Sequence, residues 1–196
     1  MEPWALGLPD DLRALREIYD DAGRQMAAWA RQVGLGCPQG CGICCEGFVP
    51  DVLPVEAGYL ASWLLAEQPQ RVARLLERPP GPAPAACPLY DPAAPAAHCT
   101  VYPGRPLVCR LFGYAGMRTR HGGWAFRLCR HMPAPDGWDA RAVADRPDLP
   151  SPPVMGDIQA QVPGLRPGDA PFRRPLPDAL REALQRLLLR RARSSG

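Results

Sequence analysis

The sequence contains no lysine, and all 23 of its basic residues are arginine. This absence excludes a lysine Schiff base, a lysine general base and a lysine phosphate clamp. No apolar run approaches the roughly 20 residues that a membrane helix needs. The start Met1-Glu2-Pro3-Trp4 lacks the basic and then apolar stretch of a secretory signal. We therefore expect a cytoplasmic protein that does not associate with a membrane.

Strong charge is also missing. The net charge is +3, and the arginines are scattered along the chain apart from the tail at 190–193. A basic patch or stripe would be needed to indicate a nucleic-acid partner, so we expect none. The 196 residues, 46% of them apolar, allow one globular domain with extensions.

Eight cysteines are the main feature that the sequence does contain. Structural disulfides are rare in a reducing cytoplasm, so closely spaced cysteines indicate a metal. Glycines at 40 and 42 permit the sharp bends that turn neighbouring thiolates toward one ion. The adjacent Cys44 and Cys45 are expected to diverge and to serve different metals, or to comprise one ligand and one neighbour. We predict that every cysteine is a metal ligand: Cys37, Cys41, Cys44, Cys45, Cys87, Cys99, Cys109 and Cys129.

The identity of the metal stays open between iron and zinc. Eight thiolates suit two tetrahedral zinc sites, or one four-cysteine cluster with four further cysteines. Four cysteines within nine residues, and Cys-Pro at 37–38 and 87–88, favour an iron–sulfur cluster. The leading hypothesis is a redox or metal-handling protein that binds metal ions, and an unknown protein partner is left open. The alternatives are a zinc-stabilised interaction module without catalysis and a metal-dependent enzyme, for which the sequence identifies no catalytic residue.

Several other polar residues accompany the cysteines. An arginine near thiolates offsets their charge and donates hydrogen bonds to sulfur. The candidates for such a supporting role are Tyr102, Arg105, Arg110 and His98. In the alternative interpretation Tyr102 packs in the core, Arg105 holds backbone carbonyls and His98 is an ordinary loop residue. His131 follows Cys129 by two residues and is another possible neighbour, whereas His121 is expected to be exposed in a turn.

Apolar periodicity predicts an α+β fold that is mostly helical, with a compact cysteine-rich centre, a small β-hairpin and an irregular Pro-rich C-terminal extension. Helices are expected over 10–35, where Asp10 is the N-cap, and over 54–67, with a short piece after Pro69. A last helix over 178–193 is expected to place Leu180, Leu184, Leu187 and Leu188 on one packing side. The hairpin would pair 112–120 with 124–129. The predicted organisation is an N-terminal helix (1–36), a metal-binding domain (37–132) containing a linker at 79–86, an irregular segment (133–177) and a C-terminal helix (178–196).

The cysteine pattern resembles the CxxCxxCC family of zinc- or iron-chelating domains. The matching motifs occur in order: the run from Cys41 to Cys45, Cys87-Pro88-Leu89, Cys99-Thr100-Val101-Tyr102, and Arg105-Pro106-Leu107-Val108-Cys109-Arg110. Three residues separate Cys37 from Cys41, where the family has two. The resemblance covers residues 37–130 and implies metal or cluster binding, but it implies no particular reaction.

Overall fold

The computed structural model of the chain describes residues 3–38, 41–77, 86–93, 98–138, 142–144 and 148–194. Its α-helices are α1 (Asp10–Gln32), α2 (Pro54–Glu67), α3 (Pro69–Glu77), α4 (Leu107–Leu111), α5 (Met155–Gln159) and α6 (Leu176–Ser194). Its strands are β1 (Asp51–Val52), β2 (Met117–Arg118), β3 (Trp124–Arg127), β4 (Ala142–Ala144) and β5 (Arg174–Pro175), and short 3-10 turns connect several elements. The expected α+β, mostly helical fold is confirmed. Most of the predicted linker at 79–86 lies outside the described residues.

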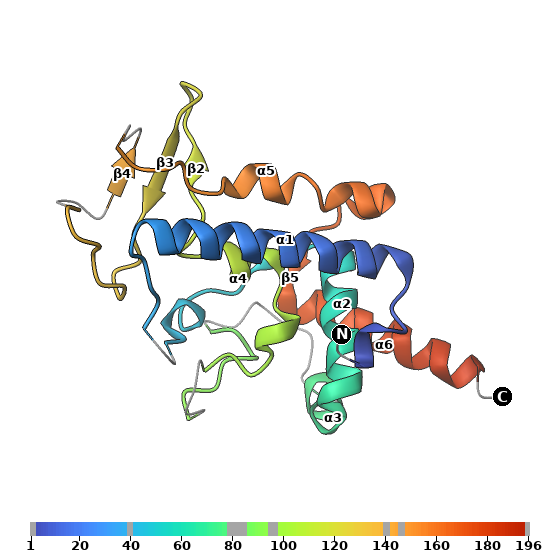
Figure 1. The fold of residues 1–196 in the computed structure, drawn as a ribbon. Coiled ribbons are helices and arrows are strands. Elements are labelled where there is room, and N and C mark those ends of the chain that lie inside the picture. Colours follow the sequence, from blue (N-terminus) through green and yellow to red (C-terminus); the bar gives the residue numbers. More distant parts are fainter. Residues whose placement is uncertain are drawn as a thin grey trace.

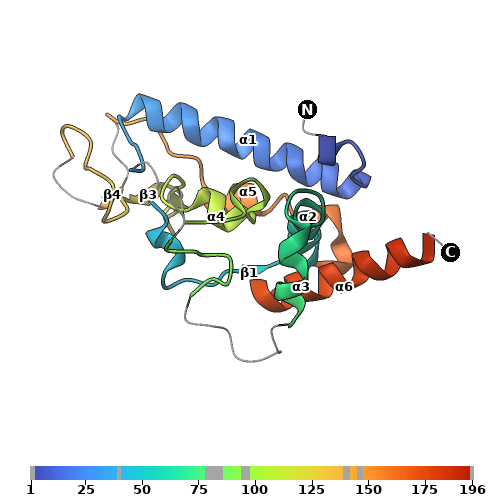
Figure 2. The same cartoon turned by 90° about the horizontal axis from the view of Figure 1, so that it is seen from below.

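The long helix α1 runs along one side of the molecule (Figures 1 and 2). The sheet β2–β3–β4 lies at its C-terminal end, and α2, α3 and α6 gather toward its N-terminal end. The cysteine-bearing loops and α4 lie between these two groups, on the side of α1 that faces the rest of the molecule. The cysteines are therefore placed between a helical and a β part of the same molecule.

Helix α1 buries the predicted apolar stripe, from Leu12 through Tyr19 to Trp29. The stripe packs on the start of α2 and on α4 and α5, as a spacing of three and four residues requires of a helix that covers a core. The expected N-cap is wrong: Pro9 occupies that position and Asp10 is the first helical residue. Asp10 still lies where the positive end of the helix dipole favours an acidic side chain.

Helices α2, α3 and α6 form a second apolar core, separate from the cluster under α1. Helix α2 has the predicted bounds, because Pro54 suits its first turn and Pro69 begins the next helix. Leu180 and Leu184 of α6 are buried against α2, so the prediction of a docked C-terminal helix is confirmed. Leu188 follows Leu184 by four residues on the same side of α6, but it is 37% exposed and does not belong to the buried cluster.

The third core joins the end of α1 to the sheet. The predicted hairpin is present, with a hydrogen bond from Thr119 N–H to the Gly123 carbonyl (2.9 Å) and a positive φ of 85° at Gly122. Its first strand is shorter than predicted, because residues 112–116 follow α4 in a turn that contains Gly113 at φ 81°. Strand β4, which the sequence did not predict, pairs antiparallel with β3.

The Pro-rich segment that follows is largely irregular but contains α5, and it is tied to distant parts of the chain. Trp29 Nε1 donates to the Pro150 carbonyl (2.8 Å), and Arg166 pairs with Asp11. The predicted division into four parts remains a prediction. No helix in the described ranges has both the length and the apolarity needed to cross a bilayer.

Candidate metal centre

The first cysteine run is shaped by two tight turns. The Cys41 N–H donates to the Pro38 carbonyl (3.1 Å), and the Cys45 N–H donates to the Gly42 carbonyl (2.9 Å) in a 3-10 turn, Ile43–Cys45. The Cys44 and Cys45 side chains hydrogen-bond to each other. The expectation that they diverge is therefore wrong, because the tight turn keeps both thiols facing the same space.

The second group is held to the first by backbone hydrogen bonds. The Cys87 N–H donates to the Cys45 carbonyl (3.3 Å), while Cys99 forms an isolated bridge with Tyr90. Thr100 donates through both its N–H (3.1 Å) and its hydroxyl (2.7 Å) to the Leu89 carbonyl. These contacts fix 87–90 beside 98–101 and bring Cys99 within hydrogen-bonding reach of Cys45.

Helix α4 presents Cys109 to the same space. Leu107 and Leu111 are four residues apart and both are buried under α1, so Cys109 between them faces away from that core. The Leu107 N–H donates to Glu56 Oε1 (2.9 Å), and the other oxygen of Glu56 accepts from the Leu53 N–H (3.0 Å). Glu56, which is 3% exposed, therefore joins the start of α2 to the start of the helix that carries Cys109. No sequence motif singles out this residue.

Strand alternation delivers the last cysteine. Phe126 and Leu128 are buried in the core beneath the sheet, whereas Ala125, Arg127 and Cys129 alternate with them. Cys129 lies close enough to Cys37 to interact with it electrostatically. The Cys37 N–H in turn donates to the Tyr114 hydroxyl (2.9 Å), so the end of the hairpin and the start of the first run meet.

The thiols from these separate segments converge on one cavity of about 70 Å³. This volume is several times the roughly 10–15 Å³ that one water molecule requires. Seven cysteines line the cavity: Cys37, Cys41, Cys44, Cys45, Cys99, Cys109 and Cys129. Cys87 lines an adjoining space with Cys44, Cys45 and Cys109. All eight cysteines carry thiols that are not paired in disulfides.

The thiols differ in acidity because they share protons unequally. The Cys45 S–H donates toward Cys44 and Cys99, which raises the pKa of Cys45 and lowers the other two. Together with the Arg105 charge, this sharing lowers the pKa of Cys44 to about 6 and that of Cys99 to about 7. Burial raises the pKa of Cys109 to about 12. Two thiols are thus ready to bind a metal as thiolates at neutral pH, and others must lose a proton on binding.

The contacts of Tyr102, Arg105 and Arg110 differ in part from the alternative in which Tyr102 packs in the core and Arg105 holds backbone carbonyls. Tyr102 is 50% exposed instead of packing in the core, and the Arg105 guanidinium lies 3.4 Å from its ring centroid. Arg110, and not Arg105, holds backbone carbonyls: its Nε donates to the Arg105 carbonyl (2.8 Å) and another nitrogen donates to Pro103. The Arg110 guanidinium also stacks 4.3 Å from the Tyr19 ring, and its burial lowers its pKa.

The three histidines differ in whether they line the thiol cavity, and His98 does not have the position that its candidate supporting role requires. Nδ1 of His98 lies 3.3 Å from the Asp91 carbonyl, and His98 does not contribute to the described lining of the thiol cavity. His121 is exposed in the hairpin turn. His131 does line the cavity, and its Nε2 accepts from Arg130 Nε (2.8 Å).

The chemistry of the cavity fits a soft metal, although the thiols are not placed around a common point. Among the described residues, no three His, Cys, Asp or Glu side chains are arranged to hold one ion together. Thiolates select zinc and iron–sulfur centres, and the described lining contains no carboxylate of the kind that calcium and magnesium prefer. Arg105 Nε is buried without an acceptor among the described residues. Since buried donors are normally satisfied, a thiolate- or sulfide-bearing centre would supply what Arg105 lacks.

This arrangement defines a thiol-rich, metal-chelating type of site. Residues 36–130 match the model of the CxxCxxCC family, described as "Putative zinc- or iron-chelating domain". Through this segment the chain is similar to the CxxCxxCC family of zinc- or iron-chelating domains, as its motifs predict. No curated protein and no solved structure matches the chain.

Proposed function

We propose that the cysteines hold iron as an iron–sulfur cluster and that the protein acts in electron transfer or metal handling. The observation that carries this proposal is the single cavity lined by seven thiols from distant segments of the chain. Two structural zinc sites would each enclose four thiolates separately, and one shared space suits a polynuclear centre better. When bound, such a cluster exchanges single electrons at a potential set by nearby hydrogen bonds and charge.

The chain's own residues have distinct parts in this proposal. All eight cysteines are the ligand candidates, and the lowered pKa values of Cys44 and Cys99 favour their thiolate forms, which are the forms that bind a metal. Arg105 donates its buried N–H to the centre and offsets its negative charge. Tyr102 covers the outer face of Arg105, and Arg110 holds the loop by its carbonyls. A reducing cytoplasm suits eight cysteines that form no disulfide, and we place the protein there.

The direct test measures iron, zinc and acid-labile sulfide in the full chain purified without oxygen, together with its visible spectrum. We expect brown protein that contains iron and sulfide in comparable amounts. Colourless protein with one or two zinc ions per chain would refute the cluster and would establish the zinc-stabilised module. Protein with neither metal after reconstitution would refute metal binding by this cavity.

A further inference from the structure

A larger open cavity, of about 620 Å³, adjoins the thiol cavity. Its walls come from residues 43–48, from the turn after α4 and from β3 with the residues that follow it. The volume lies within the range of about 300–1,000 Å³ that is typical of small-molecule sites. We call it the Phe48–Arg127 groove, after one residue of each of two walls.

One wall of the groove is apolar and exposed. The Phe48 and Phe112 rings stack with centroids 6.4 Å apart and planes 28° from parallel, and the side chains are 40% and 44% exposed. Met117, which is 63% exposed, extends the same wall. None of the three belongs to the buried clusters that form the described core. A gathered apolar surface of this kind marks a binding site more often than isolated exposed residues do.

The other wall carries positive charge. Arg127, Arg130 and His131 line it, and the described lining includes no aspartate or glutamate. Arg127 reaches the groove because it alternates with the buried Phe126 along β3. The nearby Arg118 differs, because it pairs with Asp157 and does not line the groove. The groove therefore combines an aromatic wall with a cationic one.

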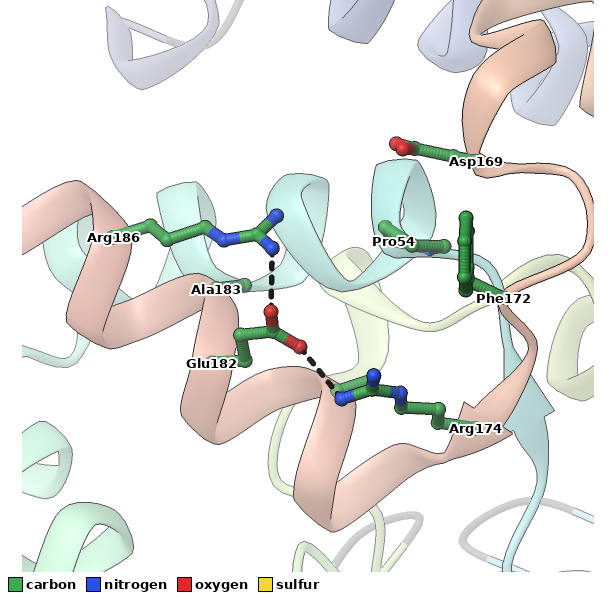
Figure 3. Close-up of a pocket in the computed structure, with 8 residues that line it drawn as sticks. Pro54, Asp169, Phe172, Arg174, Glu182, Ala183 and Arg186 are labelled. Carbon is green, nitrogen blue, oxygen red and sulfur yellow. Dashed lines mark hydrogen bonds and ion pairs between the residues drawn. The ribbon is translucent and has the colours of Figure 1, made fainter.

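In a second concavity the protein itself neutralises the positive charge. Between α2 and α6, Glu182 lies between Arg174 and Arg186 and pairs with both (Figure 3). Phe172 and Pro54 face this space, but the charge of its arginines is already met by Glu182. The same residue types therefore leave no cationic wall there for a ligand, in contrast to the Phe48–Arg127 groove.

We propose that the Phe48–Arg127 groove binds a small organic anion with an aromatic body. The ring lies against Phe48 and Phe112, and the carboxylate faces Arg127 and Arg130. Cys44, Cys129 and His131 line both the groove and the thiol cavity, so a bound anion lies beside the thiols. That a metal centre occupies the neighbouring position rests on the proposed function, whereas anion binding itself does not.

The test uses 2-naphthoate as the probe and 2-naphthalenemethanol as its neutral counterpart, in equilibrium dialysis against the full chain as purified. Charge-assisted contacts to arginine favour the carboxylate, and we expect it to bind about tenfold more tightly, which corresponds to about 1.4 kcal/mol. Arg127→Gln combined with Arg130→Gln is expected to remove this preference and leave the neutral probe unchanged. Phe48→Ala is expected to weaken both probes about fivefold, through lost aromatic contact.

Two control variants make the same types of substitution outside the groove. Phe172→Ala removes an exposed phenylalanine from the other concavity, and Arg190→Gln removes an exposed arginine from α6. Both control variants should bind the two probes like the parent protein. Equal affinity for both probes, loss of binding in the controls, or no binding of either probe at millimolar concentration would overturn the proposal. Metal content is measured on the same samples: naphthoate binding without metal refutes only the proposed function, and metal without naphthoate binding refutes only the groove.

Discussion

Replacing the buried Glu56 by glutamine tests how the site is attached to the rest of the fold. Glu56 accepts hydrogen bonds from the backbone N–H groups of Leu53 and Leu107, and the Tyr19 hydroxyl lies 3.5 Å from Oε1. A glutamine keeps one of the two oxygens and turns an NH₂ group toward one of the backbone donors. Leaving a buried donor unsatisfied costs about 1–3 kcal/mol, so we expect a loss of about 2 kcal/mol.

For a chain of this length, 1 kcal/mol shifts the unfolding temperature by about 2–4 °C. Glu56→Gln is therefore expected to lower Tm by about 4–8 °C in calorimetry. Glu67→Gln is the matched control, because Glu67 is exposed on the same helix and should leave Tm within about 1 °C. If Glu56→Gln behaved like Glu67→Gln, the bonds to Leu53 and Leu107 would carry no net stability and the reasoning would be refuted.

Three other predictions concern the cysteines and the packing of the loop beside them. Cys109→Ala is expected to abolish metal retention, as measured by elemental analysis. Val108→Ala is the control on the same short helix and should retain the metal, because Val108 is outside the described lining of the thiol cavity. Full metal content in Cys109→Ala would remove Cys109 from the ligand set. In metal-free protein, the pKa of about 6 means that Cys44 becomes a thiolate as pH rises through 6, so its alkylation rate should rise around pH 6 and level off above 7. Mass spectrometry of iodoacetamide-treated samples measures this, with urea-unfolded protein as the reference, and a midpoint near 9 in the folded chain would contradict the proton sharing with Cys45. Gly104→Ala would place a methyl group 2.9 Å from Leu60 Cδ1 and 3.3 Å from Trp63, which is expected to lower the free energy of unfolding by about 1–3 kcal/mol. Gly164→Ala is the control, because its methyl group would meet nothing within 4 Å. Equal Tm values for the two variants would show that the core accommodates the extra methyl group without loss of stability.

The parts of the fold that the sequence predicts are those with local causes. The stripe of α1 repeats every three to four residues, and prolines mark where α2 and α3 begin, so both signals can be read without knowing the tertiary structure. The hairpin also follows from a local signal, since Gly122 can adopt the positive φ that the turn requires. The cysteine motifs indicate the resemblance to the family for the same reason: their spacing lies within the sequence itself.

The parts that escape prediction depend on residues far apart in the chain. Glu56 looks like a surface residue of a helix, and although its bond to Leu53 is local, its role in joining α2 to α4 depends on the hydrogen bond from Leu107, 51 positions away. Arg105 and Arg110 have the same side chain, lie in one motif and both line the thiol cavity. Arg110 stacks on Tyr19 and Arg105 lies over Tyr102, and only the tertiary structure distinguishes these surroundings. Strand β4 has only three residues and depends on β3 for its pairing. Such contacts leave no periodic trace in the sequence.

The spread of the cysteines along the chain has a consequence for synthesis. A centre that uses both Cys37 and Cys129 cannot close until the ribosome has added the 92 residues from position 38 to Cys129. At about 5–20 residues per second, the four thiols of the first run wait about 5–20 s for their most distant partner. During that interval the first four cysteines lack Cys129, so a centre that requires Cys129 as a ligand forms only after most of the chain has been made.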